Sequence, residues 1–190
     1  MAEVKTVESG VRLAAFDAAV GLDRGAGKLK EILWYLVKVV FFLSALPWPS
    51  TFKCSLLRVF GAKIGKGVNI KPRVNIHFPW KLIVGNDVWI GEEAFLLNFE
   101  QMCIGHDVCI SQRAFLCGGN HDFRVPEMPY RNGPITLEDG SWVGASVFIS
   151  PGVTVGIDTV ITAGSIVTGN LAPNGIYKGN PAAYIKQRWK

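Results

Sequence analysis

Three histidines are the side chains of this 190-residue chain best suited to proton transfer near neutral pH: His77, His106 and His121. An imidazole has an unperturbed pKa of about 6.5, so it can both take and return a proton under physiological conditions. His121 differs from the other two because the sequence around it, LCGGNHD, leads into a segment with three prolines, DFRVPEMPYRNGP, at 122–134. A ring at the start of such a loop can face a cleft, so we expect His121 to act as a general base toward a hydroxyl group.

Metal chemistry is not expected from the remaining candidate ligands. The chain has four cysteines, namely Cys54, Cys103, Cys109 and Cys117. They form no CxxC pair, and structural metal sites need clustered ligands, so we expect reduced, mostly buried thiols in a cytoplasmic protein. A three-histidine zinc site of the hydratase kind would need an HxxxxH pair, whereas the histidines here are separated by 29 and 15 residues. His77 and His106 are therefore expected on the solvated surface.

The elements that must position His121 follow from an aliphatic residue that recurs every six positions. The series comprises Ile64, Ile70, Ile76 and Leu82; Val84, Ile90 and Leu96; Ile104, Ile110 and Leu116; and Leu137, Val143, Ile149, Val155, Ile161 and Val167. A period of six matches neither the α-helix nor the alternating strand. It fits a coil of three short strands with the aliphatic side chains stacked inside, about 18 residues per circuit.

The repeat thus predicts a mainly β chain folded as a parallel β-helix, with glycines at its sharp corners. Two-residue slips after Leu82 and Leu96 predict longer circuits of about 20 residues in the first part of the shaft. The repeat disappears at 122–134, and a loop that leaves a stacked solenoid commonly lies on its binding face. Handedness does not follow from the repeat.

The remaining boundaries follow from composition. We expect a flexible N-terminus at 1–27, a helical segment at 28–60, the β-helix at 61–172 with the loop 122–134 protruding, and a tail with a short closing helix at 173–190. The apolar stretch Ile32–Trp48 contains Lys38 and ends between two prolines, which is short for a membrane span. It can be a helix packed on the protein, a helix lying in a membrane interface, or a true span, in decreasing order of preference.

Charge is distributed unevenly along the chain. Residues 1–81 hold 13 Lys and Arg against 5 Asp and Glu, a net of +8, and residues 82–190 hold 7 against 10, a net of −3. A basic front half favours nucleic acid or an anionic membrane surface. The basic residues are scattered and form no RNA-binding signature, so we do not expect a nucleic-acid partner.

These features together resemble the hexapeptide-repeat acyltransferases, which include the maltose, galactoside and nodulation-factor acetyltransferases. The resemblance rests on the six-residue repeat, the loop after a histidine, a later WVG, and a terminal GNPA. The segments LLRVFGAKIGKGVNIKP, FPWKL, SQRAFLCGGNHD and APNGIYKGNPA are similar to colanic-acid biosynthesis acetyltransferases, over roughly 28–190. The resemblance implies a left-handed β-helix, acetyl-CoA as co-substrate, no metal, a carbohydrate acceptor, and a homotrimer with its active sites between neighbouring chains.

On the acceptor side, the resemblance implies roles for three residues. The family's catalytic histidine matches His121. Its acceptor-contacting asparagine matches Asn98 if one gap is allowed, although a turn asparagine is the alternative. Asp122 could contact the acceptor, orient the His121 ring, or only structure the loop, since a backbone carbonyl could orient the ring instead.

On the cofactor side, the matched positions are Trp142, Ala145, Ala163, Thr168 and Lys186. Trp142 would border the pantetheine arm, with a core role as the alternative. Backbone groups at the two alanines would contact the pantetheine amides, and an N–H near Ala145 would hold the oxyanion. The family often has Lys directly after the matched threonine, but this chain has Gly169, so phosphate binding would depend on Lys178, Lys186 or Arg188.

The acceptor itself follows only from the resemblance. We expect O-acetylation of a sugar hydroxyl in exopolysaccharide biosynthesis, at the cytoplasmic face of the membrane, with peripheral membrane contact as an option. A small-sugar or xenobiotic acetyltransferase would keep the same chemistry with another acceptor. A β-helix scaffold without catalysis is the remaining alternative.

Overall fold

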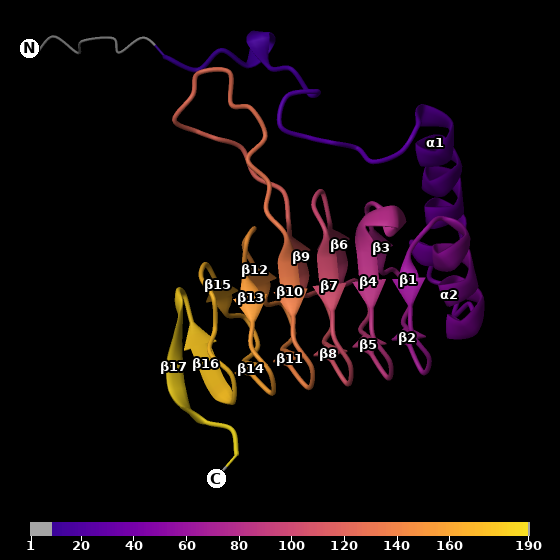
Figure 1. Cartoon of the computed structure of the whole chain (residues 1–190), viewed down its shortest axis with the longest axis vertical. Coiled ribbons are helices and arrows are strands. Elements are labelled where there is room, and N and C mark those ends of the chain that lie inside the picture. Colours follow the sequence, from indigo (N-terminus) through magenta and orange to yellow (C-terminus); the bar gives the residue numbers. More distant parts are fainter. Residues whose placement is uncertain (1–8, 190) are drawn as a thin grey trace, which may run out of the picture.

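The computed structural model describes residues 9–189 and shows a left-handed parallel β-helix with two helices at its first coil (Figure 1). Three sheets form the sides of the shaft. Sheet A contains β1 (Lys63–Ile64), β4 (Leu82–Val84), β7 (Met102–Ile104), β10 (Ile135–Leu137) and β13 (Thr154–Val155). Sheet B contains β2 (Asn69–Ile70), β5 (Trp89–Ile90), β8 (Cys109–Ile110), β11 (Trp142–Val143), β14 (Val160–Ile161), β16 (Gly175–Gly179) and β17 (Ala182–Gln187). Sheet C contains β3 (Asn75–Ile76), β6 (Phe95–Leu97), β9 (Phe115–Cys117), β12 (Phe148–Ile149) and β15 (Ile166–Val167).

The predicted aliphatic series forms the core of this shaft. Ile70 lies beside Ile90, and Ile90 beside Ile110, in parallel register. Each of these side chains is at most 2% exposed, so identical residues stack from coil to coil in a closely packed interior. The register also confirms the predicted slips. Ile83 pairs with residue 63 and Cys103 with Ile83, a rise of 20 residues per coil, whereas Thr154 pairs with Thr136 after 18.

The helical segment caps the first coil. It consists of α1 (Lys28–Val37), the π-helical turn η2 (Lys38–Phe42) and α2 (Ser50–Val59). Trp34 is buried on the inner side of α1, and its Nε1 donates to the carbonyl oxygens of Ile76 and His77 at 3.1 and 3.0 Å. Lys53 of α2 is buried and donates to the carbonyl oxygens of Ile70 and Lys71. No helix within residues 9–189 is both long and apolar enough to cross a membrane.

The N-terminal segment runs from α1 along the edge of the shaft to the protruding loop (Figure 1). Residues 1–8 of the N-terminus that we expected to be flexible lie outside the described residues, but 9–27 follow a defined path. The segment includes one 3-10 turn, η1 (Leu13–Ala15). The N–H of Arg12 donates to the carbonyl of Pro126 in the loop, and Asn132 donates to the carbonyl of Gly21. A second 3-10 turn, η3 (Pro79–Lys81), precedes β4.

The prediction of a C-terminal helix is wrong, because the tail forms a β-hairpin of β16 and β17. β16 extends sheet B parallel to β14, and β17 pairs antiparallel with β16. A helix of one or two turns would be marginal in isolation, whereas the open edge of β16 offers a full row of backbone partners. After the hairpin, Arg188 donates to the carbonyl oxygens of Gly140 and Asp158 at 2.8 and 3.1 Å, which fixes the tail to the shaft.

Candidate active site

His121 lies in the loop between β9 and β10, where the chain leaves the edge between sheets C and A. The ring Nδ1 is 2.7 Å from the carbonyl oxygen of Met128 across the loop. A carbonyl can only accept, so Nδ1 carries the proton and Nε2 presents its lone pair. Within residues 9–189, Nε2 makes no hydrogen bond. In the neutral ring, the loop therefore fixes the tautomer that a general base requires.

Two aromatic rings fix the plane of this imidazole. Tyr130 stacks on it at a centroid distance of 4.8 Å, and the two residues also form a backbone bridge. Phe16 of the N-terminal segment contacts both rings edge-on, each at 5.4 Å. His121 is thus half-buried, with its ring orientation set by the loop and by a segment from the other end of the shaft.

Asp122 structures the loop and does not orient the imidazole. Its carboxylate accepts from Nε of Arg124 at 2.8 Å and from a terminal nitrogen of the same guanidinium at 2.6 Å. These bonds lower the pKa of Asp122 to about 2, so it is ionised throughout the neutral range. The Asp122 backbone N–H also donates to Pro129 across the loop. Of the alternatives left open for orienting the ring, the structure selects a backbone carbonyl, that of Met128.

Asn98 was expected to contact the acceptor, but its position in the structure does not allow this contact. It is 0% exposed, and both its amide oxygen and its amide nitrogen bond to the backbone of Phe78, one coil earlier. Asn98 Oδ1 accepts from the Phe78 N–H at 2.9 Å, and Nδ2 donates to the Phe78 carbonyl at 2.6 Å. The side chain ties two coils together beneath the site, and it is not available to an acceptor.

Three of the expected cofactor residues gather on sheet B and its edge with sheet C. Trp142 of β11 is 47% exposed, so the core alternative does not hold, and its Nε1 donates to Ser111 Oγ at 2.9 Å. That bond holds the indole against the face of the shaft. Ala145 and Ala163 lie at the same edge on consecutive coils, since the Gly164 N–H donates to the Ala145 carbonyl. Both are at least partly exposed, and their backbones could receive an extended ligand.

The other expected residues lie elsewhere on the shaft. Thr168 follows β15 at the edge between sheets C and A, and Lys186 is exposed on β17. Lys178 is exposed on β16, but the guanidinium of Arg188 is held by the carbonyls that fix the tail. In one chain, His121 projects from the edge between sheets C and A, whereas Ala145 and Ala163 lie at the edge between sheets B and C. The structure does not bring the base and these alanines together within one chain.

The other histidines have structural surroundings. His106 is exposed as expected, and its Nδ1 accepts from the Asn86 N–H at 3.0 Å. His77 is half-buried instead of solvated, because α1 covers it; burial, and then Lys38 and Arg24, lower its pKa to about 4. Within residues 9–189, no three His, Cys, Asp or Glu side chains are placed to hold a metal ion.

Known proteins similar to this chain were found by sequence and by structure. No protein-family model matches it. A colanic acid biosynthesis acetyltransferase of Escherichia coli is 38% identical over 176 residues, covering 93% of this chain and 96% of the relative. The galactoside O-acetyltransferase of the same organism is 30% identical, covering 70% and 67%. A hexapeptide-repeat acetyltransferase of Vibrio cholerae, solved with acetyl-coenzyme A, superposes with a TM-score of 0.77 at 22% identity, covering 86% and 89%.

Replacing Asn98 with alanine tests the reassignment of this residue. The Asn98→Ala variant leaves a buried N–H and carbonyl of Phe78 without partners, so we expect the free energy of unfolding to fall by about 1–3 kcal/mol in urea titrations. Asn86→Ala is the matched control, because Asn86 accepts from the Lys66 N–H in an exposed hydrogen bond between coils. Equal stability of the two variants would contradict the structural role given to Asn98.

Proposed function

This chain belongs to the hexapeptide-repeat acetyltransferases, and from that premise we propose that it transfers an acetyl group from acetyl-coenzyme A to a hydroxyl group of a carbohydrate. The observation that carries the proposal is the bond between His121 Nδ1 and the Met128 carbonyl, which leaves Nε2 free to accept a proton. The structure of the Vibrio cholerae acetyltransferase with acetyl-coenzyme A supports the choice of donor.

In the proposed reaction, His121 Nε2 takes the proton of the acceptor hydroxyl as that oxygen attacks the thioester carbonyl carbon. The carbonyl oxygen gains negative charge, and a backbone N–H at the edge of sheets B and C, near Ala145, would stabilise it. The carbon–sulfur bond then breaks, the imidazolium returns its proton to the leaving thiolate, and an acetyl ester and free coenzyme A result. Base catalysis of this kind contributes about 10²–10⁴-fold.

The proposed groove lies between two chains of a homotrimer. His121 and the alanine pair Ala145 and Ala163 project from different edges of the shaft, so a neighbouring chain would supply the edge that His121 lacks. In a cyclic trimer such a contact occurs three times, once between each pair of neighbouring chains, and the three contacts form a closed ring. The thioester arm would then run past Trp142, with Lys186 and Lys178 near the phosphates of the nucleotide. Thr168, at the edge between sheets C and A, would approach the nucleotide from the other chain of the groove.

We propose a sugar of an exopolysaccharide repeat unit as the acceptor, at the cytoplasmic face of the membrane. The relative that is 38% identical over nearly its whole length, named for colanic acid biosynthesis, supports this class. The exposed apolar side of α1 supports peripheral contact with the membrane, because three leucines and one isoleucine there are exposed. Thiol release from acetyl-coenzyme A, measured with free, nucleotide-linked and lipid-linked sugars, identifies the acceptor and separates this function from the small-sugar alternative.

Removing the imidazole tests its role as the base. We expect His121→Ala to lower kcat for thiol release by at least ~10²-fold, because the variant keeps the fold but has no group to take the hydroxyl proton. His106→Ala is the control, since that ring is exposed at a corner outside the loop. A His121→Ala variant with full activity would end the assignment.

Mixing inactive subunits tests the shared groove. We expect His121→Ala and Ala163→Trp each to be inactive as homotrimers, the second because an indole blocks the expected path of the pantetheine. Co-refolded mixtures should regain thiol release, since each mixed trimer contains one interface with an intact base and an intact groove, about one site in three. Mixtures that stay inactive, or an active wild-type monomer in sedimentation, would contradict sites between chains.

Membrane contact is tested by sedimentation with vesicles of phosphatidylcholine and phosphatidylglycerol. Leu36 is exposed on the apolar side of α1, so Leu36→Glu should reduce co-sedimentation by at least ~10-fold through the lost apolar burial. The control is Val59→Glu, at an exposed apolar position on α2. Wild-type protein that fails to bind these vesicles at low salt would remove the membrane proposal.

A further inference from the structure

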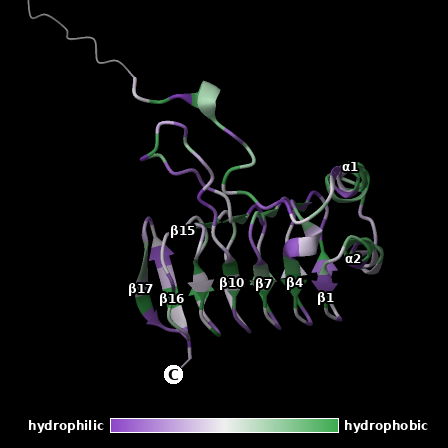
Figure 2. Cartoon of the chain, turned by 45° about the horizontal axis from the view of Figure 1, so that its top comes forward, coloured by the Kyte–Doolittle hydropathy of each residue, from purple (hydrophilic) through white to green (hydrophobic). Residues whose placement is uncertain are grey.

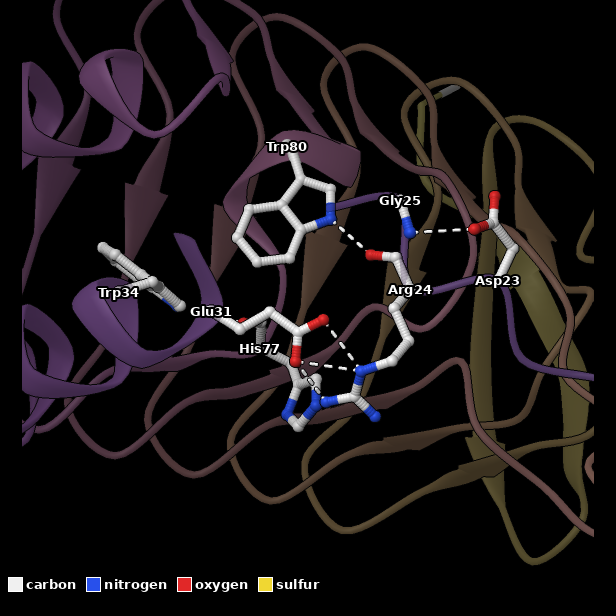
Figure 3. Close-up of polar contacts among 7 residues, drawn as sticks. All are labelled: Asp23, Arg24, Gly25, Glu31, Trp34, His77 and Trp80. Atoms are coloured by element: carbon white, nitrogen blue, oxygen red, sulfur yellow. Dashed lines mark hydrogen bonds and ion pairs between the residues drawn. The ribbon is translucent and has the colours of Figure 1, made fainter. Parts of the chain in front are cut away.

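A pocket of about 280 Å³ lies between α1 and the first coil, away from His121. Trp34, Phe78 and Trp80 contribute aromatic walls, and Figure 3 shows His77 beside the paired side chains of Arg24 and Glu31. Trp80 Nε1 donates to the Arg24 carbonyl at 2.7 Å, which closes the pocket on the side of the N-terminal segment. Nothing in the proposed acetyl transfer uses this cavity.

Lys38 is the unusual member of the lining. It is only 8% exposed, and within residues 9–189 its ammonium group has no hydrogen bond and no carboxylate within ion-pairing distance. Nζ lies over the Tyr35 ring, 5.7 Å from its centroid. Burial lowers the pKa of Lys38, and no carboxylate offsets that effect. The stem of Lys38 is buried while its ammonium group faces the pocket, where an anion could become its partner.

The other ionisable groups of the pocket leave that charge uncompensated. Glu31 is engaged by Arg24, whose Nε lies 2.8 and 2.9 Å from its two carboxylate oxygens, so this pair is neutral overall. His77, with a pKa of about 4, is uncharged at neutral pH. The pocket therefore has a net charge close to +1, located on Lys38, and fits a ligand with one anionic group.

The mouth of the pocket is apolar. Ile32 and Tyr35, which line it, are 58% and 61% exposed. They continue into an exposed apolar side of α1, whose members recur at steps of three and four residues. This side comprises Leu29, Ile32, Leu33 and Leu36. Figure 2 shows α1 at the outer end of the shaft, and among the described residues each of these four side chains is at least 47% exposed. An anion that enters here would bring an apolar chain against the helix.

We propose that this pocket binds the phosphate group of a membrane lipid, with Lys38 as its cationic partner and the apolar side of α1 against the lipid chain. The occupant is an amphiphile, because neither a free anion nor an uncharged hydrocarbon satisfies both parts of the site. The π-turn that starts at Lys38 is consistent with a binding role, since such turns occur frequently at functional sites.

The position of the pocket deepens the proposed function, on which this step rests. A continuous row of rings leads from it to the base: Phe78 to Phe99 at 5.9 Å, Phe99 to Tyr130 at 5.6 Å, and Tyr130 to His121 at 4.8 Å. A saccharide attached to a phosphate at Lys38 would extend along these rings. The distance along the shaft between the pocket and His121 would then determine which hydroxyl of the saccharide reaches the base.

The test uses the full-length protein and three soluble probes: octyl phosphate, octanol and inorganic phosphate. Binding is followed by calorimetry and by the fluorescence of Trp34 and Trp80, which line the pocket. We expect octyl phosphate to bind and the other two to bind at least ~10-fold more weakly. Lys38→Met should lower the affinity for octyl phosphate by at least ~10-fold, as expected for the loss of a charge-assisted hydrogen bond. Lys28→Met, on the same helix but exposed, should change binding by less than ~2-fold because its charge is screened.

Several outcomes would overturn the proposal. Equal binding by Lys38→Met and wild type would remove Lys38 from the site, and tight inorganic phosphate alone would indicate a site for free anions. If octanol binds as tightly as octyl phosphate, the pocket recognises the alkyl chain and not the phosphate group. Thermal unfolding of Lys38→Met checks the fold, which should persist because methionine removes only the buried charge. Wild-type thiol release with a soluble sugar tests the transferase separately, so a failure of lipid binding is distinguishable from a failure of the proposed function.

Discussion

The hydrogen bonding between successive coils constrains everything else in this protein. Inside the shaft, each short strand pairs in parallel with the strand one coil earlier and the strand one coil later. The β7–β10, β8–β11 and β9–β12 pairs have the same offset of 33 residues on the three sheets. The sides of the shaft cannot change without breaking these ladders, whereas the edges carry turns that are free to lengthen. The protein places its longest excursion at one edge, and that excursion holds the imidazole. A rigid stack thereby fixes both ends of the loop that holds His121.

The environment of His121 shows how such a loop can hold one side chain in a fixed orientation. The Met128 carbonyl selects the tautomer, Tyr130 supports one face, and Phe16 closes against the ring edge. These three contacts fix the tautomer of the neutral ring and its orientation. In the proposed function the acetyl donor lies along a different edge, so a neighbouring chain would have to complete the catalytic arrangement.

The sequence predicted the periodic part of the structure, which is the β-helix and its core. It did not predict the features that depend on contacts between segments far apart in the chain. The six-residue series located the shaft, its core and the longer first coils, because a stacked coil repeats the same environment at fixed spacing. The C-terminal segment was expected to be a helix. Its local composition does not indicate that it pairs with the edge of β16. Asn98 was expected in the site, but its burial depends on Phe78 one coil away. The clamp on His121 involves a backbone carbonyl, which no residue type reveals. A phenylalanine near the start of the chain offered no periodic signal either.

The two ends of the shaft are closed in different ways. At the first coil, α1 and α2 cover the open ladder, and Lys53 occupies carbonyls that would otherwise face outward. At the last coil, β17 crosses the exposed edge of β16 in the opposite direction and is followed by Arg188. An uncapped parallel coil is a template for the next copy of itself, and stacking end to end would produce fibres. The reversed strand ends that template, so the length of the particle is set by its own chain, and growth along the axis is blocked in one direction by a change of strand polarity and in the other by helices.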